Sequence, residues 1–311
     1  MKFSVTIPAY KSQYLDEAIK SVVSQTYTDW ELIIVDDCSP ENLKAIVKPY
    51  LTDNRISYYR NEKNCGAANV VDNWNICLSY CTGDYVICIG DDDRLLPCCL
   101  EELRQTINRH PGLNVYHLHT EIIDEKGMVK EVLPERPEKE DALSAMMGRW
   151  NGRKQFIGDF CFSREHLNSC GGYYPLPFAW GSDDITIFRA MLPEGIANTR
   201  KTCFQYRENI YSISLSHHHE EKVTAMMMLK QWHQKALDNL LTQGHYSHET
   251  IQKATEAMNR FVKGQASYQI SCDIKQGGIR RFCFWLRNNT KGILSKYDIV
   301  KIYAIPIIRK S

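Results

Sequence analysis

The sequence predicts an α/β protein with a mostly parallel sheet flanked by helices, followed by a helical extension. Three observations support this fold class. Apolar runs typical of buried strands alternate with helical patterns over the first hundred residues. Two of these runs end in clusters of aspartate, which begin at Asp36 and Asp91. Beyond about residue 216 the strand patterns stop and long helical patterns replace them.

Four short runs rich in β-branched, aromatic and other apolar residues predict the first strands. They are residues 3–7 (FSVTI), 31–35 (ELIIV), 55–59 (RISYY) and 85–89 (YVICI). The second run is continuously apolar, which is typical of a strand covered on both faces. Helical spacing falls between the runs at residues 13–25 and 67–81, and Ser39-Pro40-Glu41 is typical of a helix start.

Strands that alternate with helices form parallel sheets with right-handed crossovers. Ligands of such sheets bind beyond the carboxyl ends of the strands. Asp36-Asp37 and Asp91-Asp92-Asp93 both follow predicted strand ends. We therefore expect the two clusters to line one pocket.

The middle of the chain is less regular. Residues 113–133 predict a hairpin that turns at residues 124–127, and residues 155–163 predict another strand. The polar, proline-bearing stretch 134–141 predicts a surface loop. Residues 183–192 predict a helix that begins with two acids, which suits the positive end of a helix.

The last part of the chain is basic. Residues 275–311 hold nine Lys and Arg against one acid, which gives +8 in a chain whose formal net charge is +1. Aromatic and aliphatic residues are interleaved with these cations, and such a segment fits an anionic membrane surface. The alternative is a helical cap with a solvated basic face. We expect two domains, residues 1–215 and residues 216–311.

Composition excludes several classes. The near-neutral charge gives no general attraction to nucleic acid, and no apolar run reaches the ~18–20 residues of a membrane helix. The start of the chain does not resemble a secretion signal. None of the twelve cysteines forms a Cys-x-x-Cys pair, so reduced packing cysteines are expected, with a redox pair at Cys98-Cys99 as the alternative. The chain lacks the glycine motifs of NAD and P-loop sites. A cytoplasmic protein, peripheral on the inner face of the cell membrane, is expected.

Gly90-Asp91-Asp92-Asp93 is the strongest local motif. Three adjacent carboxylates repel one another, so a cation or nearby positive groups must keep them ionised. Hard divalent ions take oxygen ligands, and Mg²⁺ often bridges carboxylates to substrate phosphates. The motif is a candidate metal–diphosphate site, and a solvated acidic turn is the alternative.

Five segments carry a resemblance to a known family. In order they are PAY (8–10), SQTYTDWELIIVDDCS (24–39), NCGAANVVDNWN (64–75), CTGDYVICIGDDDRLLP (81–97) and GSDDITIFRA (181–190). Together they resemble the family 2 nucleotide-sugar glycosyltransferases. The resemblance implies a GT-A fold with a Rossmann-like sheet over residues 1–215. It also implies Mn²⁺ or Mg²⁺, inverting transfer and a nucleotide-diphosphate-sugar donor, with a UDP-sugar favoured. A glycan or lipid-linked acceptor in cell-surface polysaccharide synthesis is expected.

The resemblance assigns residues to the nucleotide and the metal. The nucleotide candidates are Pro8, Ala9, Tyr10, Asp36, Asp37 and Asp91. Asp37 matches the position that hydrogen-bonds the base, and Asp36 supports the pocket. Asp92 matches the metal ligand, with Asp93 as the second.

Catalysis requires a base on the acceptor side. Asp183 matches the family's general base, and Asp184 is the alternative. The competing interpretation is that both acids only stabilise the helix start. Tyr206-Arg207, followed by Ser212 and Ser214, matches a loop that closes over the donor.

The sequence departs from the family pattern at several positions. Many members have an acid where Gly90 stands, an Arg near Val71 and a Glu in place of Ser182. The tract 217–219 (HHH) is either a diphosphate contact or a packing element. Two other classes therefore stay open, a catalytically silent nucleotide-sugar-binding scaffold and a sugar nucleotidyltransferase. The second lacks the glycine-rich basic loop that it needs after the first strand.

Overall fold

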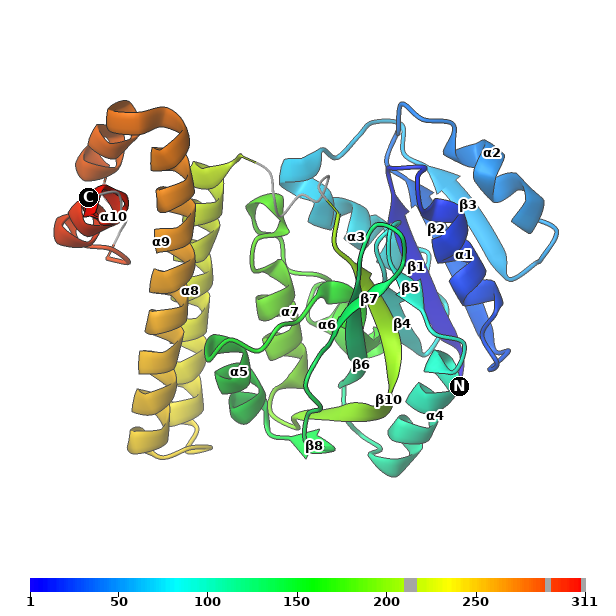
Figure 1. Ribbon diagram of the computed structural model, residues 1–311. Helices are drawn as coiled ribbons and strands as arrows, with labels where there is room; N and C mark the ends of the chain where they lie inside the picture. Colours follow the sequence, from blue (N-terminus) through cyan, green and yellow to red (C-terminus); the bar gives the residue numbers. More distant parts are fainter. Residues whose placement is uncertain (210–216, 289–291, 309–311) are drawn as a thin grey trace. The chain divides into compact units, whose positions relative to one another are not determined.

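The computed structural model describes residues 1–209, 217–288 and 292–308 and contains a single ten-stranded sheet (Figure 1). The strand order is β3-β2-β1-β4-β9-β6-β10-β5, with β7 beside β6 and β8 beside β10. The four predicted strands are parallel neighbours at one side of the sheet: β1 (Phe3–Ala9), β2 (Trp30–Asp36), β3 (Ile56–Arg60) and β4 (Tyr85–Cys88). The expected α/β fold class is confirmed.

The other half of the sheet is mixed. Its strands are β5 (Arg94–Leu95), β6 (Val115–Ile123), β7 (Val129–Val132), β8 (Lys139–Glu140), β9 (Phe160–Ser163) and β10 (Ile196–Arg207). The predicted hairpin is β6–β7, and Gly127 supplies the positive φ of 79° at its turn. The prediction of a surface loop at residues 134–141 is wrong for β8, because this strand pairs with β10. Strand β10 itself is absent from the sequence prediction because IANTRKTCFQYR mixes charged and apolar residues without regular alternation.

Short helices separate the strands along the chain. They are α1 (Leu15–Val23), α2 (Leu43–Val47), α3 (Val70–Ser79), α4 (Cys99–Arg109), α5 (Ala142–Trp150), α6 (Arg164–Ser169) and α7 (Ser182–Met191). Alternate side chains of β1 and β2, such as Val5 and Ile34, share one core cluster with Leu15 of α1 and Leu103 of α4. All twelve cysteines are free, and six are buried. The six buried cysteines pack in the interior, and burial raises the pKa of the Cys99 thiol well above its usual value.

The chain divides into two compact units. The first holds residues 1–145, residues 154–175 and the stretch from Thr186 through β10. The second holds two short inner segments, Met146–Arg153 and Leu176–Ile185, together with the C-terminal helices. The start of α7, where Asp183 and Asp184 lie, is therefore part of the second unit.

Three helices form the bulk of the second unit: α8 (His219–Thr242), α9 (His248–Arg287) and α10 (Lys296–Ile308). Helices α8 and α9 run side by side, joined by the break that Thr242-Gln243-Gly244 predicts (Figure 1). Their shared core includes Leu229, Leu237, Met258 and Ile270. Within the described ranges, no helix combines the length and apolarity needed to cross a bilayer.

Candidate active site

Parallel pairing brings the carboxyl ends of β1, β2 and β4 to one edge of the sheet. Ala9 is in register with Asp36, and the Ala9 carbonyl accepts the backbone N–H of Asp37 at 2.9 Å. The backbone N–H groups of Tyr10 and Lys11 donate to Asp91 at 2.7 Å each. The two predicted aspartate clusters therefore lie at the same edge, on either side of the loop after β1.

The nucleotide candidates from β1 differ in what they expose. Pro8 and Ala9 are the last two residues of the strand, and the Ala9 side chain is buried. Tyr10 follows the strand and is 43% exposed. Tyr10 is thus the residue of this segment with a side chain available to a ligand.

Asp36 is a structural acid. It is fully buried, pairs with Arg60, and accepts hydrogen bonds from the Tyr58 hydroxyl at 2.6 Å and the Ser39 backbone at 2.7 Å. The Asp36 carboxylate raises the pKa of Tyr58 to about 12, after the larger effect of burial. The supporting role expected for Asp36 agrees with these contacts.

Asp37 organises the loop after β3. Its carboxylate accepts from the Asn61 amide at 2.8 Å and from the Cys65 backbone at 2.9 Å. Asn61 also donates to Asn73 on α3 at 3.0 Å. Val71, where the family pattern has a nucleotide-facing Arg nearby, is buried in the same helix. Asp37 thus fixes the wall of the candidate nucleotide site.

The three aspartates after β4 have separate surroundings. Asp91 is half-buried and is bonded to the loop after β1. Burial, followed by the Asp92 charge, raises the pKa of Asp91 to about 6. Asp93 is 6% exposed and accepts from the Arg207 backbone at 3.0 Å and the Gly90 backbone at 3.2 Å. Its pKa is raised well above the usual value by burial and then by Asp92.

The space where a side chain of residue 90 would begin is occupied by neighbouring carboxylates. A Cβ atom built on Gly90 would lie 2.6 Å from an oxygen of Asp92 and 2.9 Å from an oxygen of Asp93. Both distances are shorter than real Cβ contacts. A larger residue at position 90 would therefore require the Asp92 and Asp93 side chains to move.

Arg207 at the end of β10 and Asn209 just after it hold the turn. The sequence placed Arg207 in a loop over the donor and gave neither residue this supporting role. The Arg207 guanidinium donates to the Asp92 carbonyl at 2.8 Å and to Glu17 of α1 at 2.7 Å, and it lies 4.1 Å from the Tyr14 ring. Asn209 donates to the Asp92 carboxylate at 2.5 Å. More than a hundred residues separate these partners along the chain, so no local pattern could reveal them.

The structure describes only part of the loop that is predicted to close over the donor. Arg207 is 1% exposed and points into the protein rather than toward a ligand. Ser212 and Ser214 lie outside the described residues. Arg207 supports the acidic turn that would carry the metal.

The carboxylate oxygens of the acidic turn are of the ligand type that hard divalent cations prefer. Among the described residues, no group of three or more His, Cys, Asp and Glu side chains is arranged to hold a metal by itself. Asp92 is half-exposed, whereas its two neighbours bond backbone N–H groups. Mg²⁺-type sites commonly combine one or two carboxylates with substrate phosphates. The donor set fits an ion completed by a diphosphate.

The second acidic pair begins α7. Asp184 is 1% exposed and forms an ion pair with Arg149, whose Nε lies 2.8 Å from the carboxylate. Asp183 is half-buried, and burial followed by the Asp184 charge raises its pKa to about 7. Gly181, with φ of 88°, allows α8 to approach, since a Cβ there would lie 2.3 Å from Leu229. The pair therefore has one ion-paired acid and one acid poised near neutrality.

The histidine tract packs within the second unit. His219 bonds Gln269 at 2.7 Å, His217 bonds Gln276 at 2.9 Å, and His218 stacks on Phe178. These contacts agree with a packing element.

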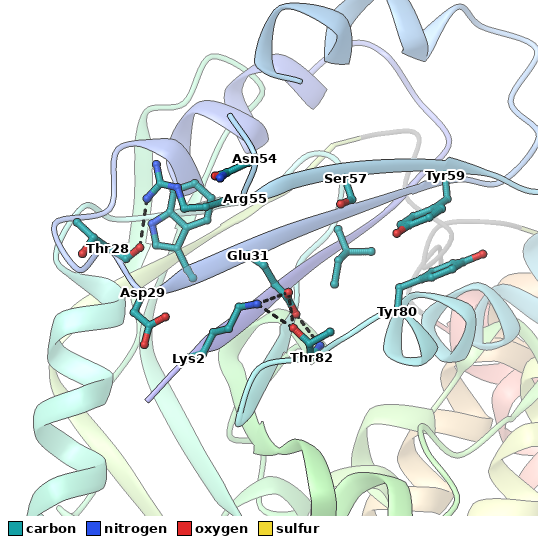
Figure 2. Close-up of a pocket in the computed structure, with 12 residues that line it drawn as sticks. Lys2, Thr28, Asp29, Glu31, Asn54, Arg55, Ser57, Tyr59, Tyr80 and Thr82 are labelled. Atoms are coloured by element: carbon teal, nitrogen blue, oxygen red, sulfur yellow. Dashed lines mark hydrogen bonds and ion pairs between the residues drawn. The ribbon is translucent and has the colours of Figure 1, made fainter. Parts of the chain in front are cut away.

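A separate hollow lies at the opposite ends of the same strands. Its volume is about 360 Å³, and Figure 2 shows Lys2, Glu31 and Thr82 bonded along one side of it. Tyr59 stacks on Tyr80 at 3.8 Å at the other side. Lys2 precedes β1 and Glu31 lies near the start of β2, so this hollow contains none of the predicted site residues.

Comparison with known proteins places the chain among glycosyltransferases. The model of the family described as glycosyl transferase family 2 matches residues 4–172. A Campylobacter jejuni GalNAc(5)-diNAcBac-PP-undecaprenol beta-1,3-glucosyltransferase is 36% identical over 109 residues, which cover 34% of this chain and 35% of that protein. The Staphylococcus aureus poly(ribitol-phosphate) beta-N-acetylglucosaminyltransferase TarS is 29% identical over 145 residues, which cover 46% of this chain and 24% of TarS. The chain spans about a quarter to a half of the length of the curated relatives that it matches.

Solved structures support the fold. The S. aureus TarS fragment 1–349 in complex with UDP-GlcNAc aligns with a TM-score of 0.70 at 18% identity, covering 100% of this chain and 92% of that one. A Pyrobaculum calidifontis mannosyltransferase with GDP-Man and Mn²⁺ aligns with a TM-score of 0.52 at 14% identity, covering 99% and 88%. The expected GT-A fold is confirmed.

Proposed function

The chain belongs to glycosyl transferase family 2, and we propose that it is a metal-dependent inverting transferase. It moves a sugar from a nucleotide-diphosphate donor to a hydroxyl of a glycan or lipid-linked saccharide in cell-surface polysaccharide synthesis. One observation carries the proposal: the predicted nucleotide and metal segments meet at the carboxyl edge of β1, β2 and β4. Ligands of open α/β sheets bind at this edge.

The donor is a nucleotide-diphosphate sugar, with UDP as the favoured carrier. Asp37 and the loop that it holds receive the base, while Tyr10 lies beside the nucleoside. A related fold holds UDP-GlcNAc in TarS, which agrees with this choice of carrier. Asp36 and Asp91 support the nucleotide site indirectly, because their hydrogen bonds hold its loops.

The metal would be Mn²⁺ or Mg²⁺, and Asp92 and Asp93 are the residues that would hold it. When bound, the ion supplies Lewis-acid stabilisation of the charge on the leaving diphosphate. Arg207 and Asn209 keep Asp92 in place through its carbonyl and its carboxylate. Burial, followed by the Asp92 charge, raises the pKa of Asp91 and Asp93, and a cation at this turn would relieve the repulsion between the charges.

Asp183 is the general base. The acceptor oxygen forms a bond to the anomeric carbon while the bond from that carbon to the diphosphate oxygen breaks. The electron pair leaves with the diphosphate, and the hydroxyl proton passes to Asp183. A raised pKa suits this role, because a base is most effective when its pKa lies near the working pH. Asp184 instead fixes the start of α7 through Arg149.

A binding experiment combined with a transfer assay tests the proposal. Isothermal titration calorimetry is run with UDP and GDP, each with and without Mn²⁺, and donor turnover is measured as release of the nucleoside diphosphate. We expect tight UDP binding only with Mn²⁺, together with turnover. Turnover that persists in EDTA would exclude the metal-dependent mechanism.

A catalytically silent scaffold is the second candidate, and the glycine at position 90 favours it. Many family members carry an acid there, and this chain lacks it. A scaffold would bind UDP with Mn²⁺ and release no diphosphate from any nucleotide sugar. The same two measurements therefore separate the candidates.

A further inference from the structure

Helix α10 carries apolar side chains on two faces. Its inner face packs on α9: Ile299 is 2% exposed, and the Tyr303 ring stacks on Phe282 at 4.2 Å. Tyr297 and Val300 are 66% and 45% exposed on the outside. These two residues are three positions apart, so they are neighbours on the helix surface. Tyr297 and Val300 are thus exposed to solvent, although α10 already packs another apolar face on α9.

The last part of α9 also exposes an apolar side chain. Ile279, which follows the break at Gly278, is 56% exposed. Exposed apolar side chains beside cations on a helix are typical of a segment that lies at a membrane surface. We call the exposed residues of 275–301 in α9 and α10 the basic helical surface.

Five exposed cations accompany these apolar residues: Lys275, Arg280, Arg287, Lys296 and Lys301. None of them forms an ion pair among the residues that the structure describes. The acids nearby are neutralised by other cations, since Asp298 pairs with Lys263 at 2.7 Å and Asp273 pairs with Arg281. The basic helical surface therefore has an uncompensated positive charge.

We propose that the basic helical surface docks on an anionic lipid bilayer. Tyrosine and aliphatic side chains enter the headgroup region, and the cations bind the lipid phosphates. Tyrosine is well suited to this boundary because its ring is apolar and its hydroxyl is polar. The inference rests on the proposed function for its purpose, since docking would bring the enzyme to a lipid-linked acceptor. The docking itself requires no catalysis.

Co-sedimentation with vesicles tests the docking, using the full chain. Vesicles of phosphatidylcholine alone are compared with vesicles that also contain phosphatidylglycerol, at increasing NaCl. We expect sedimentation only with phosphatidylglycerol and its loss at high salt, because surface charges are screened. The K296Q/K301Q variant should bind about 25-fold more weakly, which is about fivefold for each cation. The Y297S/V300S variant should also bind more weakly.

Matched variants in the first unit provide the control. K44Q/K48Q removes two exposed lysines, and M128S/V129S removes two exposed apolar residues of the β6–β7 hairpin. Both should bind vesicles as the wild type does. Circular dichroism confirms folding, and calorimetry with UDP and Mn²⁺ confirms the donor site independently.

Three results would overturn the proposal. One is equal binding to the two kinds of vesicle, and another is an equal loss of binding in the control variants. The third is self-association in light scattering that Y297S/V300S abolishes, without any vesicle binding. That result would assign the surface to a second copy of the chain. A chain that docks but fails to bind UDP would instead contradict the proposed function alone.

Discussion

The aspartate clusters at residues 91–93 and 183–184 look alike in sequence and differ in structure. After β4, Asp91 and Asp93 bond backbone N–H groups, and half-exposed Asp92 lies between them with Asn209 on its carboxylate. At the start of α7, Asp184 is neutralised by Arg149, and Asp183 has a pKa raised to about 7. In each cluster the partners divide the acids into those that hold the fold and one that is left for chemistry.

The comparison shows how hydrogen bonding assigns roles. Asp92 lies in an acidic turn whose neighbours raise one another's pKa values, which favours a cation. Asp183 lies in a desolvated position beside a second acid, which favours a proton. In the proposed function, the same residue type therefore binds the metal in one unit and takes up the proton in the other.

The largest expected effect comes from Asp92→Ala. Loss of the metal ligand should reduce transfer by about a thousandfold or more, because the Lewis acid supplies several kcal/mol. Calorimetry should show that UDP binding no longer depends on Mn²⁺. Asp84→Asn, at the start of β4, should leave both properties unchanged. Full Mn²⁺-dependent binding in the Asp92 variant would remove Asp92 from the metal site.

Asp183→Asn should separate binding from catalysis. Removal of a general base lowers kcat by about 10²–10⁴-fold. UDP and Mn²⁺ should still bind with wild-type affinity, since the metal ligands are unaltered. Steady-state kinetics and calorimetry measure the two quantities. A variant that keeps its full kcat would show that Asp183 only stabilises the helix start.

Arg149→Ala should act on stability. It leaves the buried Asp184 carboxylate without its cation, which costs about 3–5 kcal/mol in the free energy of unfolding. Urea denaturation measures the loss, and the double variant R149A/D184N should recover part of it. Arg55→Ala, which removes a more exposed partner of Asp53, should cost about 1 kcal/mol or less. Similar losses in both variants would deny Asp184 its structural role.

Arg207→Lys should weaken the metal site from a distance. Lysine keeps the charge but cannot bond Asp92, Glu17 and the β6–β7 turn together. Residues that orient metal ligands typically change metal affinity by about 10–100-fold. Mn²⁺ binding is followed by electron paramagnetic resonance in the presence of UDP, and thermal unfolding is measured beside it. Arg55→Lys should leave Mn²⁺ affinity unchanged, and an equal effect there would refute the assignment.

The smallest effect is a pH dependence of stability. The pKa of Asp183 is raised in the folded state, so the protonated carboxyl group adds to the free energy of unfolding. This stabilisation is fully present below the unfolded-state pKa of about 4. It is lost as the pH rises through about 7. The wild type should therefore lose stability relative to Asp183→Asn across this range. Parallel urea curves at all pH values would contradict the raised pKa.

Much of the candidate site follows from local sequence. Apolar runs that end in Asp36 and Asp91 predict parallel strands, and the carboxyl ends of parallel strands share an edge. The sequence placed Arg207 in a loop over the donor, but the contacts of Arg207 and Asn209 with Asp92 could not be predicted because they depend on the course of β10. Arg149 escapes prediction for the same reason, since α5 and α7 pair across a long stretch of chain.

The crowded position of Gly90 constrains how this sequence can change. A Cβ atom introduced there would lie 2.6 Å from an oxygen of Asp92 and 2.9 Å from an oxygen of Asp93, so these side chains would have to move. Asn209 and the Arg207 backbone hold the same two carboxylates, and such a movement would disturb both hydrogen bonds. A single exchange at position 90 would therefore be felt at the end of β10.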